Sequence, residues 1–422
     1  MSIVASDTLD LPGLIRPGGR VLVGQATAEP LTLTRALARC ADRLPPCRLF
    51  IGPTYSETFA ADLPSHVRFE SYGAIGRTAA RLASAGRLDI FPEHISSIAR
   101  MMGTSLMAVD TVLIQIRPAI AGNGYNLGVA RDFVIDAAKK ARCVIGELNP
   151  ALPACCGGDV DGDLPFSAIV EAEHPPIEIE PPAFGETETR IASHVAALVP
   201  DGAVIQAGVG SIPAAVLIAL KDHRDLGFHS GAASDGLVDL AEAGALTNAC
   251  KEFDRGVSVT GVLLGSRRLY EFAHRNPDLR LAGPAETHDA ARIGRLGRFH
   301  AINSALEIGL AGEVGAELAG DRHVGAVGGQ VDFVRAARLS HQGRSIIALP
   351  STTRDGTSRI VLRVGTVTGA RSDADTIVTE HGVAELRGCG IDERARRMIE
   401  IAAPQWREHL SRSWHEHRRR AA

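Results

Sequence analysis

The chain has 422 residues, of which 45% are apolar and 22% charged, enough for two domains that each bury a core. Its formal net charge of −4 offers no electrostatic basis for binding nucleic acid, and no apolar run is long enough to predict a membrane span. Seven scattered cysteines without CxxC spacing, behind an N-terminus that lacks a signal-peptide pattern, predict reduced thiols, a cytoplasmic location and no metal site.

Two pairs of segments repeat in the same order along the chain. Segments 17–37 and 200–220 both predict a turn, a β-branched strand, a loop, a proline and then a helix. Segments 132–150 and 332–350 both open with Asp-Phe-Val, continue from a helix-like start into an apolar strand, and close on proline. Two matches in the same order predict two related α/β halves.

The boundary between the halves is predicted in segment 171–190, which is rich in proline and glutamate and poor in helix signals. We therefore expect an N-terminal domain over 1–175 and a C-terminal domain over 186–422. Strand–loop–helix units within each half predict mostly parallel sheets with ligands at the strand ends. The active site is expected between the two halves.

Three glycine-rich loops are candidate ligand sites. "QAGVGSIP" (206–213) separates a strand from a helix whose N-terminus could bind an anion, although a single GxG is weak evidence. "GAVGGQVDF" (325–333) predicts either a nest of N–H groups or a tight turn capped by Asp332, and "GNGYNLGV" (122–129) carries polar tips. Because two of these loops occupy related places in the repeat, we expect a shared cleft.

Further candidates are less specific. Glu147 follows a strand and could be a site carboxylate or a structural cap, and Glu380 and His381 fit an ordinary helix entry better than a metal or acid–base pair. "DLGFHSGAASDG" (225–236) is typical of an active-site loop that ends in an Asp-Gly turn, yet its middle carries no chemistry. No GxSxG nucleophile elbow is present.

Together these blocks resemble the acetyl-CoA hydrolase/transferase family, and within it the 4-hydroxybutyrate CoA-transferase-like enzymes. The resemblance covers nearly the whole chain and is dense in "DGAVIQAGVGSIPAAVLIALKDHRDLGFHSGAASDG", "GGQVDFVRAARLSHQGRSIIALPST" and "DADTIVTEHGVAELRG". It implies the paired α/β CoA-transferase fold, a coenzyme A thioester as substrate rather than a permanently bound cofactor, and a homodimer or larger homo-oligomer.

The resemblance also implies that the catalytic glutamate is missing. In relatives the loop reads like His-Thr-Glu-Met-Phe-Ser-Asp-Gly, and its glutamate attacks the acyl-CoA to form an anhydride and then a glutamyl-CoA thioester. Here Gly231 stands at the glutamate position, with Ala232 and Ala233 in place of the Met and Phe. The coenzyme A contacts that the resemblance implies are Gln206, Gly208, Val209, Gly210, Ser211, Ile212, Gly325, Gly328, Gly329 and Gln330.

We interpret the chain as an enzyme that hydrolyses or cleaves a bulky acyl-CoA without a glutamyl-CoA intermediate. The small residues at 231–233 are predicted to open volume for the acyl group, and Ser230, His229 or Glu147 could orient the water; the sequence does not choose among them. The predicted acyl pocket comprises Asn123, Tyr125, Ala232 and Ala233. C–C cleavage of a β-ketoacyl-CoA, transfer to a small carboxylate and non-catalytic binding of a CoA thioester are the alternatives.

Overall fold

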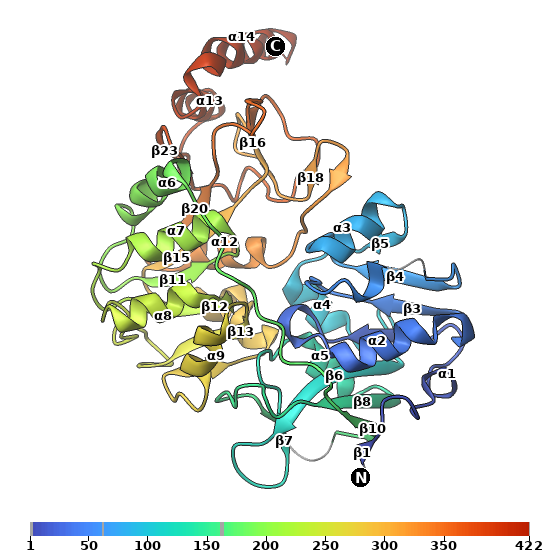
Figure 1. Ribbon diagram of the computed structural model, residues 1–422. Coiled ribbons are helices and arrows are strands. Elements are labelled where there is room, and N and C mark those ends of the chain that lie inside the picture. The colour runs from blue at the N-terminus through green and yellow to red at the C-terminus, as the bar shows by residue number, and fades with distance from the viewer. Residues whose placement is uncertain (1–2, 61–62, 161–163, 422) are drawn as a thin grey trace. The chain divides into compact units, whose positions relative to one another are not determined.

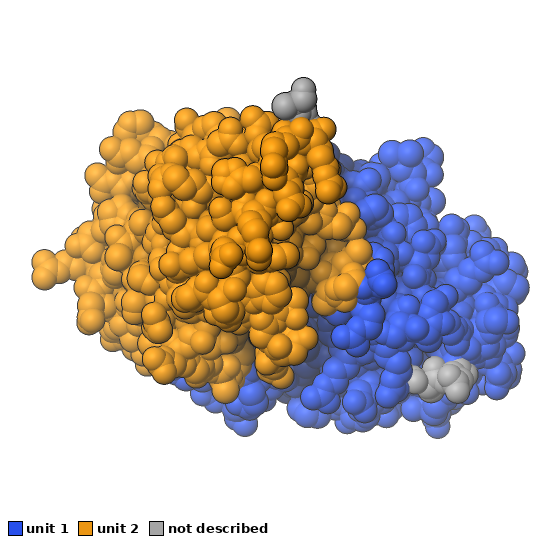
Figure 2. All heavy atoms as spheres, turned by 90° about the horizontal axis from the view of Figure 1, so that it is seen from above, with its two compact units in different colours: residues 1–180, 259–287, 321–328 blue, residues 181–258, 288–320, 329–422 orange. Residues whose placement is uncertain are grey.

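The computed structural model describes residues 3–60, 63–160 and 164–421 of the chain. The chain divides into two compact units, which Figure 2 colours separately. Unit 1 comprises Met1–Glu180, Val259–Thr287 and Asp321–Gly328, and unit 2 comprises Pro181–Ser258, His288–Gly320 and Gly329–Ala422. The domain boundaries given above, 1–175 and 186–422, stay predictions.

Unit 1 is an α/β unit built on a mostly parallel sheet (Figure 1). Its strands are mainly β1 (Ile3–Val4), β2 (Arg20–Val23), β3 (Cys47–Phe50), β4 (Val67–Ser71), β5 (Leu88–Ile90), β6 (Thr111–Pro118), β7 (Tyr125–Asn126), β8 (Cys143–Leu148), β9 (Asp159–Val160), β10 (Phe166–Glu171), β13 (Ser258–Leu263), β14 (Leu279–Leu281) and β19 (Arg322–His323). Its helices are α1 (Leu11–Leu14), α2 (Leu31–Arg39), α3 (Arg77–Ser84), α4 (Ile95–Met101), α5 (Phe133–Ala138), α9 (Arg267–Ala273) and α10 (Pro284–Thr287), with short 3-10 turns η1 (Ala26–Ala28), η2 (Ala41–Arg43) and η3 (Thr58–Ala60). The sheet order is β1-β10-β8-β6-β2-β3-β4-β5, with β7 and β9 paired off this path; β13, β14 and β19 are not part of this sheet.

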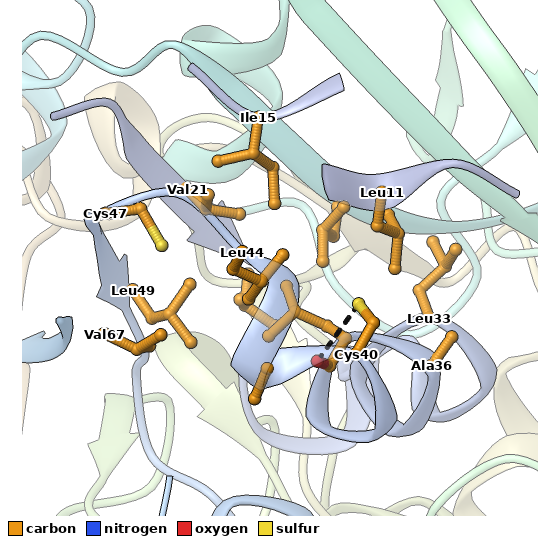
Figure 3. Packing of buried hydrophobic residues seen from close by; sticks show 14 of the residues in the cluster. Leu11, Ile15, Val21, Leu33, Ala36, Cys40, Leu44, Cys47, Leu49 and Val67 are labelled. Atoms are coloured by element: carbon orange, nitrogen blue, oxygen red, sulfur yellow. Dashed lines mark hydrogen bonds between the residues drawn. The ribbon is translucent and has the colours of Figure 1, made fainter. Parts of the chain in front are cut away.

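The layered packing of unit 1 explains why its central strand β2 is buried along its whole length. All four residues of β2 are buried, because helices cover both faces of a parallel sheet and leave no solvent-facing row. Figure 3 shows part of this core, where Leu33 and Ala36 of α2 and its C-cap Cys40 belong to the same cluster as Val21 and Leu49 of the sheet. All seven cysteines are free thiols.

Unit 2 repeats this arrangement. Its strands are β11 (Val204–Ala207), β12 (Gly227–Ala233), β15 (Phe299–Ser304), β16 (Glu307–Gly309), β17 (Val314–Gly315), β18 (Leu318–Ala319), β20 (Arg344–Ala348), β21 (Ile360–Val361), β22 (Thr376–Thr379) and β23 (Gly382–Glu385). Its helices are α6 (Glu186–Ala196), α7 (Ser211–Ala219), α8 (Asp235–Glu242), α11 (Ala290–Ile293), α12 (Gln330–Leu339), α13 (Ile391–Glu400) and α14 (Pro404–Ala421). Its main strands run in the order β12-β11-β15-β20-β22-β23, and β23 alone among them is antiparallel to its neighbour.

The predicted repeat is confirmed by the topology. The order β8-β6-β2-β3 in unit 1 matches β20-β15-β11-β12 in unit 2. In both units the first repeated segment forms a strand followed by a helix, β2 with α2 and β11 with α7. In both, the second forms a helix followed by a strand, α5 with β8 and α12 with β20. The predicted fold class, two related α/β halves with mostly parallel sheets, is therefore confirmed.

Two local predictions are wrong. Residues 227–233 form the strand β12 rather than a loop, and Asp235-Gly236 opens α8 instead of making a turn. Small residues obscured this strand, because a parallel strand buried on both faces shows no polar–apolar alternation. Residues 379–385 belong to the hairpin of β22 and β23 and are not a helix entry: Thr379 pairs with Gly382, whose φ of +140° suits glycine in the tight connection.

No helix in the described part of the chain is long and apolar enough to cross a membrane.

Candidate functional site

A cavity of about 470 Å³ in unit 2 lies at the carboxyl ends of four neighbouring parallel strands. The residues that follow β11, β15, β20 and β22 line it together with Thr187 and Glu188 of α6. Parallel strands end at the same edge of a sheet, so loops far apart in sequence meet there, and such edges are the usual ligand sites of α/β proteins. The strand-end ligand site predicted from the sequence thus has a physical counterpart in this unit.

The loop after β11 forms one wall of the cavity through residues 209–213. Gly210 lies at φ +129°, a conformation that favours glycine, and immediately precedes α7. The first N–H groups of a helix lack partners within the helix and attract anions, so this wall suits a phosphate or carboxylate. At Gly208 an added Cβ would make only ordinary contacts, the nearest 3.4 Å from Asn303 Oδ1, so the fold itself tolerates a methyl group there.

Gln206 is buried behind this loop. It exchanges two hydrogen bonds with Asn303: its Nε2 donates to Asn303 Oδ1 at 3.2 Å, and Asn303 Nδ2 donates to Gln206 Oε1 at 2.9 Å. This reciprocal amide pair joins β11 to β15. Its visible role is to hold the cavity wall in place, and the predicted contact of Gln206 with coenzyme A stays a prediction.

Two arginines that the sequence analysis missed also line the cavity. Arg354 is exposed, whereas Arg359 is half-buried, and burial lowers the pKa of the Arg359 guanidinium. Arg359 Nη1 donates to the carbonyl of Leu306 at 3.0 Å, and its Nε has no hydrogen-bond partner among the described residues. The available signal was the polar run "TTRDGTSR" (352–359) shortly after an apolar strand, at the edge where ligands bind.

Glu380 enters the cavity from the turn between β22 and β23. Its carboxylate accepts hydrogen bonds from the backbone N–H and the hydroxyl of Ser351, at 2.8 and 2.6 Å. His381 Nε2 lies 3.6 Å from the same carboxylate. These contacts fasten the loop after β20, so Glu380 supports the cavity wall. No group of three or more metal-ligand side chains occurs within the described residues.

The predicted loop 325–333 is divided between the units. Gly325 and Gly328 lie in unit 1, where their carbonyls accept the N–H groups of Ala74 and Ile95. Gly329 is the N-cap of α12 and Asp332 lies in the first turn of this helix, so a turn capped by the Asp332 side chain stays a prediction. Gly328 lies at φ +57° and Gly329 at φ −95°, opposite hands of the kind that occur in nests of backbone N–H groups, so the predicted nest stays a prediction.

Gln330, the first residue of α12, touches the cavity region of unit 2. Its Nε2 donates to the carbonyl of Ser304 at 3.0 Å, and Ser304 lines the cavity. Gln330 Oε1 and Ser304 Oγ are both buried, and within the described part of the chain neither has a hydrogen-bond partner. Buried polar atoms of this kind call for a further partner, and a ligand in the cavity would provide one.

The strand β12 carries the candidate residues around Gly231. Ser230 and His229 are fully buried. The Ser230 hydroxyl donates to the carbonyl of Ala207 at 3.2 Å, and the His229 ring meets Phe253 edge-on at 6.2 Å. Alternation along a strand sets His229 and Gly231 on one face and Ser230 on the other. Ser230 therefore braces β11, and a water-orienting role for either side chain stays a prediction.

The volume expected above Gly231 is filled. A Cβ on Gly231 would lie 2.6 Å from Cε1 and 2.7 Å from Nε2 of His288. The prediction that loss of the glutamate opens space there is wrong, because a histidine more than fifty positions along the chain occupies it. A Cβ on Gly329 would also meet His288, at 2.5 Å from Nε2, so a larger residue at 329 would strike this ring before any ligand. Sequence patterns around His288 do not single it out.

The candidate catalytic and acyl-pocket residues of unit 1 are Glu147, Tyr125 and Asn123. Glu147 is fully buried and accepts the N–H of Leu33 at 3.1 Å in the first turn of α2, and burial raises its pKa to about 7. Tyr125 packs edge-on against Phe166 at 5.3 Å, and Asn123 is exposed. The cap alternative fits Glu147, while the acyl-pocket roles of Tyr125 and Asn123 remain predictions.

Comparison with known proteins places the chain in a family. Residues 265–414 match the acetyl-CoA hydrolase/transferase C-terminal domain. The chain is 34% identical over 397 residues to a 4-hydroxybutyrate coenzyme A transferase of Clostridium kluyveri, covering 93% of this chain and 92% of that protein. It is 29% identical over 220 residues to an acetyl-CoA hydrolase of Kluyveromyces lactis, covering 50% of this chain and 41% of that protein.

A solved structure shares the fold of the whole chain. The crystal structure of RipA from Yersinia pestis superimposes with a TM-score of 0.92 at 32% identity, covering 99% of this chain and 97% of that one. The protein therefore belongs to the acetyl-CoA hydrolase/transferase family and has its fold, and it is an enzyme of that family.

Proposed function

We propose that this enzyme cleaves an acyl-coenzyme A thioester by hydrolysis, without a glutamyl-CoA intermediate. The observation that carries the proposal is Gly231: at the position where the family resemblance expects an attacking glutamate there is no side chain, and an imidazole fills the space. Without that carboxylate the anhydride route lacks its nucleophile, and water is the simplest replacement. The missing glutamate is inferred from the resemblance.

The cavity in unit 2 supports coenzyme A as the part of the substrate that is recognised. The N-terminus of α7 and the guanidinium groups of Arg354 and Arg359 suit phosphate oxygens. The N–H groups at Gly328 and Gly329 suit the oxyanion of the thioester. Coenzyme A enters as substrate rather than as a permanently bound cofactor. The cytoplasmic location, the homo-oligomer and an active site between the halves remain part of the proposal.

The acyl group is not restricted to bulky ones. A bulky group was expected because residues 231–233 are small, but His288 removes the space at 231, Ala233 is buried and Ala232 is only partly exposed. Space for a bulky acyl group would need to lie at another place in the protein. The proposal therefore keeps hydrolysis or a related cleavage and sets no lower limit on acyl size.

Transfer of coenzyme A to a carboxylate is the second candidate, favoured by the relative named 4-hydroxybutyrate coenzyme A transferase. Here the acceptor would attack directly or another carboxylate would replace the glutamate. A third reading, a protein that binds CoA thioesters without turnover, requires the cavity alone.

One experiment separates the three. Acyl-CoAs of rising size are incubated with pure protein, and free thiol is measured with and without acetate. Hydrolysis predicts thiol release that needs no acetate. Formation of acetyl-CoA, dependent on acetate and without net thiol release, would replace hydrolysis by transfer. The absence of both products beside measurable binding would leave the non-catalytic reading.

A further inference from the structure

His288 is held between two glycines of unit 2. Its ring lies so near Gly231 and Gly329 that a Cβ on either would fall within 2.7 Å of a ring atom. Neither glycine is demanded by its backbone, since Gly329 lies at φ −95° and Gly231 is not among the glycines with positive φ. The close approach of the imidazole is therefore the physical reason for glycine at both positions.

The ring cannot easily move aside. Phe333 of α12 packs against it with ring centroids 4.8 Å apart, and only 8% of His288 is exposed. The Phe333 ring also lies 3.4 Å from the Cβ position at Gly231 and 3.3 Å from that at Gly329. A side chain at either glycine would press on both rings, and such overpacking is costly in a dense core.

We propose that His288 replaces the glutamate expected at position 231, occupying its space and serving as the proton acceptor for the water that attacks the thioester. This inference rests on the proposed function. In the step, the water oxygen bonds to the carbonyl carbon while its proton passes to the imidazole. The carbon–sulfur bond then breaks, and the departing coenzyme A thiolate takes the proton back, leaving a carboxylic acid and a thiol.

The environment keeps the imidazole in the form that the step requires. Burial, assisted by nearby His229, lowers the pKa of His288 to about 3, so the ring is neutral near pH 7. A neutral imidazole carries one acceptor nitrogen, whereas an imidazolium carries none. Burial disfavours the imidazolium formed during the step, and the oxyanion of the tetrahedral intermediate would offset this cost, because opposite charges attract strongly in a poorly solvated site.

The chemical part is tested with His288→Ala and His288→Gln, which remove the base. We expect kcat for thiol release to fall about a hundredfold or more in both, with KM changed far less. Imidazole added to the buffer should restore part of the activity of His288→Ala only, which a structural role would not explain. The exposed α14 variant His415→Ala is the control. Unchanged kcat in His288→Gln, or a loss that imidazole fails to rescue in a folded His288→Ala, would overturn this role.

The steric part is tested by thermal unfolding and needs no turnover. Gly231→Ala should lower Tm in the otherwise native chain, and His288→Ala should relieve most of that loss when the two are combined. Equal losses in both backgrounds would show that the ring does not occupy position 231. A native chain that releases no coenzyme A would instead refute the proposed function, and this stability cycle would still report on His288.

Discussion

The two units differ at a pair of corresponding strand ends, those of β2 and β11. In the register of the repeat, Gln25 and Glu29 after β2 correspond to Gly208 and Ile212 after β11. In unit 1 these side chains are buried in hydrogen bonds: Gln25 Nε2 donates to Asp132 Oδ2 at 2.5 Å, and Glu29 Oε1 accepts from Thr34 at 3.0 Å. In unit 2 the same place is a cavity of about 470 Å³.

The second repeated segment differs between the units in another way. Glu147 near the end of β8 corresponds to Ile347 in β20, which is buried in the apolar core of unit 2. The carboxyl of Glu147 caps α2 and burial raises its pKa, as burial also does for Glu29. After β2 the first copy of the duplicated fold thus closes its strand end with its own polar groups, whereas after β11 the second copy has a cavity at the corresponding place.

The largest effect is expected from Glu147→Gln in the closed unit. Because burial raises the folded pKa from 4.5 to about 7, the folded state binds the proton more tightly, so wild-type stability should fall as pH rises between those values. Glutamine keeps an acceptor for the Leu33 N–H and carries no charge. At pH 8 we expect Glu147→Gln to unfold at a higher denaturant concentration than wild type. Its free energy of unfolding should be larger by on the order of 3 kcal/mol.

Denaturant titrations from pH 4.5 to 8 measure this effect, with Glu416→Gln on the exposed surface of α14 as the control. The gap between wild type and Glu147→Gln should widen with pH. If the stability of both proteins changed with pH in the same way, burial would not raise the pKa of the Glu147 carboxyl. The contrast between closed and open strand ends would then weaken.

Arg359→Gln should have the next largest effect, on the open unit. Hydrogen bonds to charged groups contribute about 1.5–3 kcal/mol, so coenzyme A should bind about 10- to 100-fold more weakly by calorimetry. The control is Arg371→Gln, whose guanidinium pairs with Glu313 and is not part of the cavity lining. Equal affinities for coenzyme A in both variants would mean that the cavity is not part of the coenzyme A site.

Gly208→Ala sharpens the comparison at the loop itself. The fold accepts a Cβ there, so Tm should change little. If a ligand approaches this backbone closely, the methyl group should weaken coenzyme A binding about tenfold, a loss of ~1.4 kcal/mol. Gly365→Ala, where a Cβ meets nothing within 4 Å, is the matched control. A lowered Tm with unchanged affinity would show that Gly208 serves packing alone.

Ser304→Ala should have the smallest effect. The buried hydroxyl has no partner among the described residues, so its removal should leave Tm nearly unchanged. If the bound ligand supplies the partner, affinity for coenzyme A should fall about threefold, within the usual range of one neutral hydrogen bond. Higher affinity in the variant would mean that the hydroxyl faces an apolar part of the ligand.

The sequence by itself determined the local elements and the duplication. A β-branched run, a loop and a helix-forming run recur in both halves because strand and helix depend on short-range periodicity, and β2–α2 and β11–α7 follow that pattern. β12 was missed, because its small buried residues lack any period. The tertiary structure alone decided the rest: four strand ends bring Arg359 to the cavity, and His288 fills the space over Gly231. Such contacts join distant residues through packing, which no local pattern encodes.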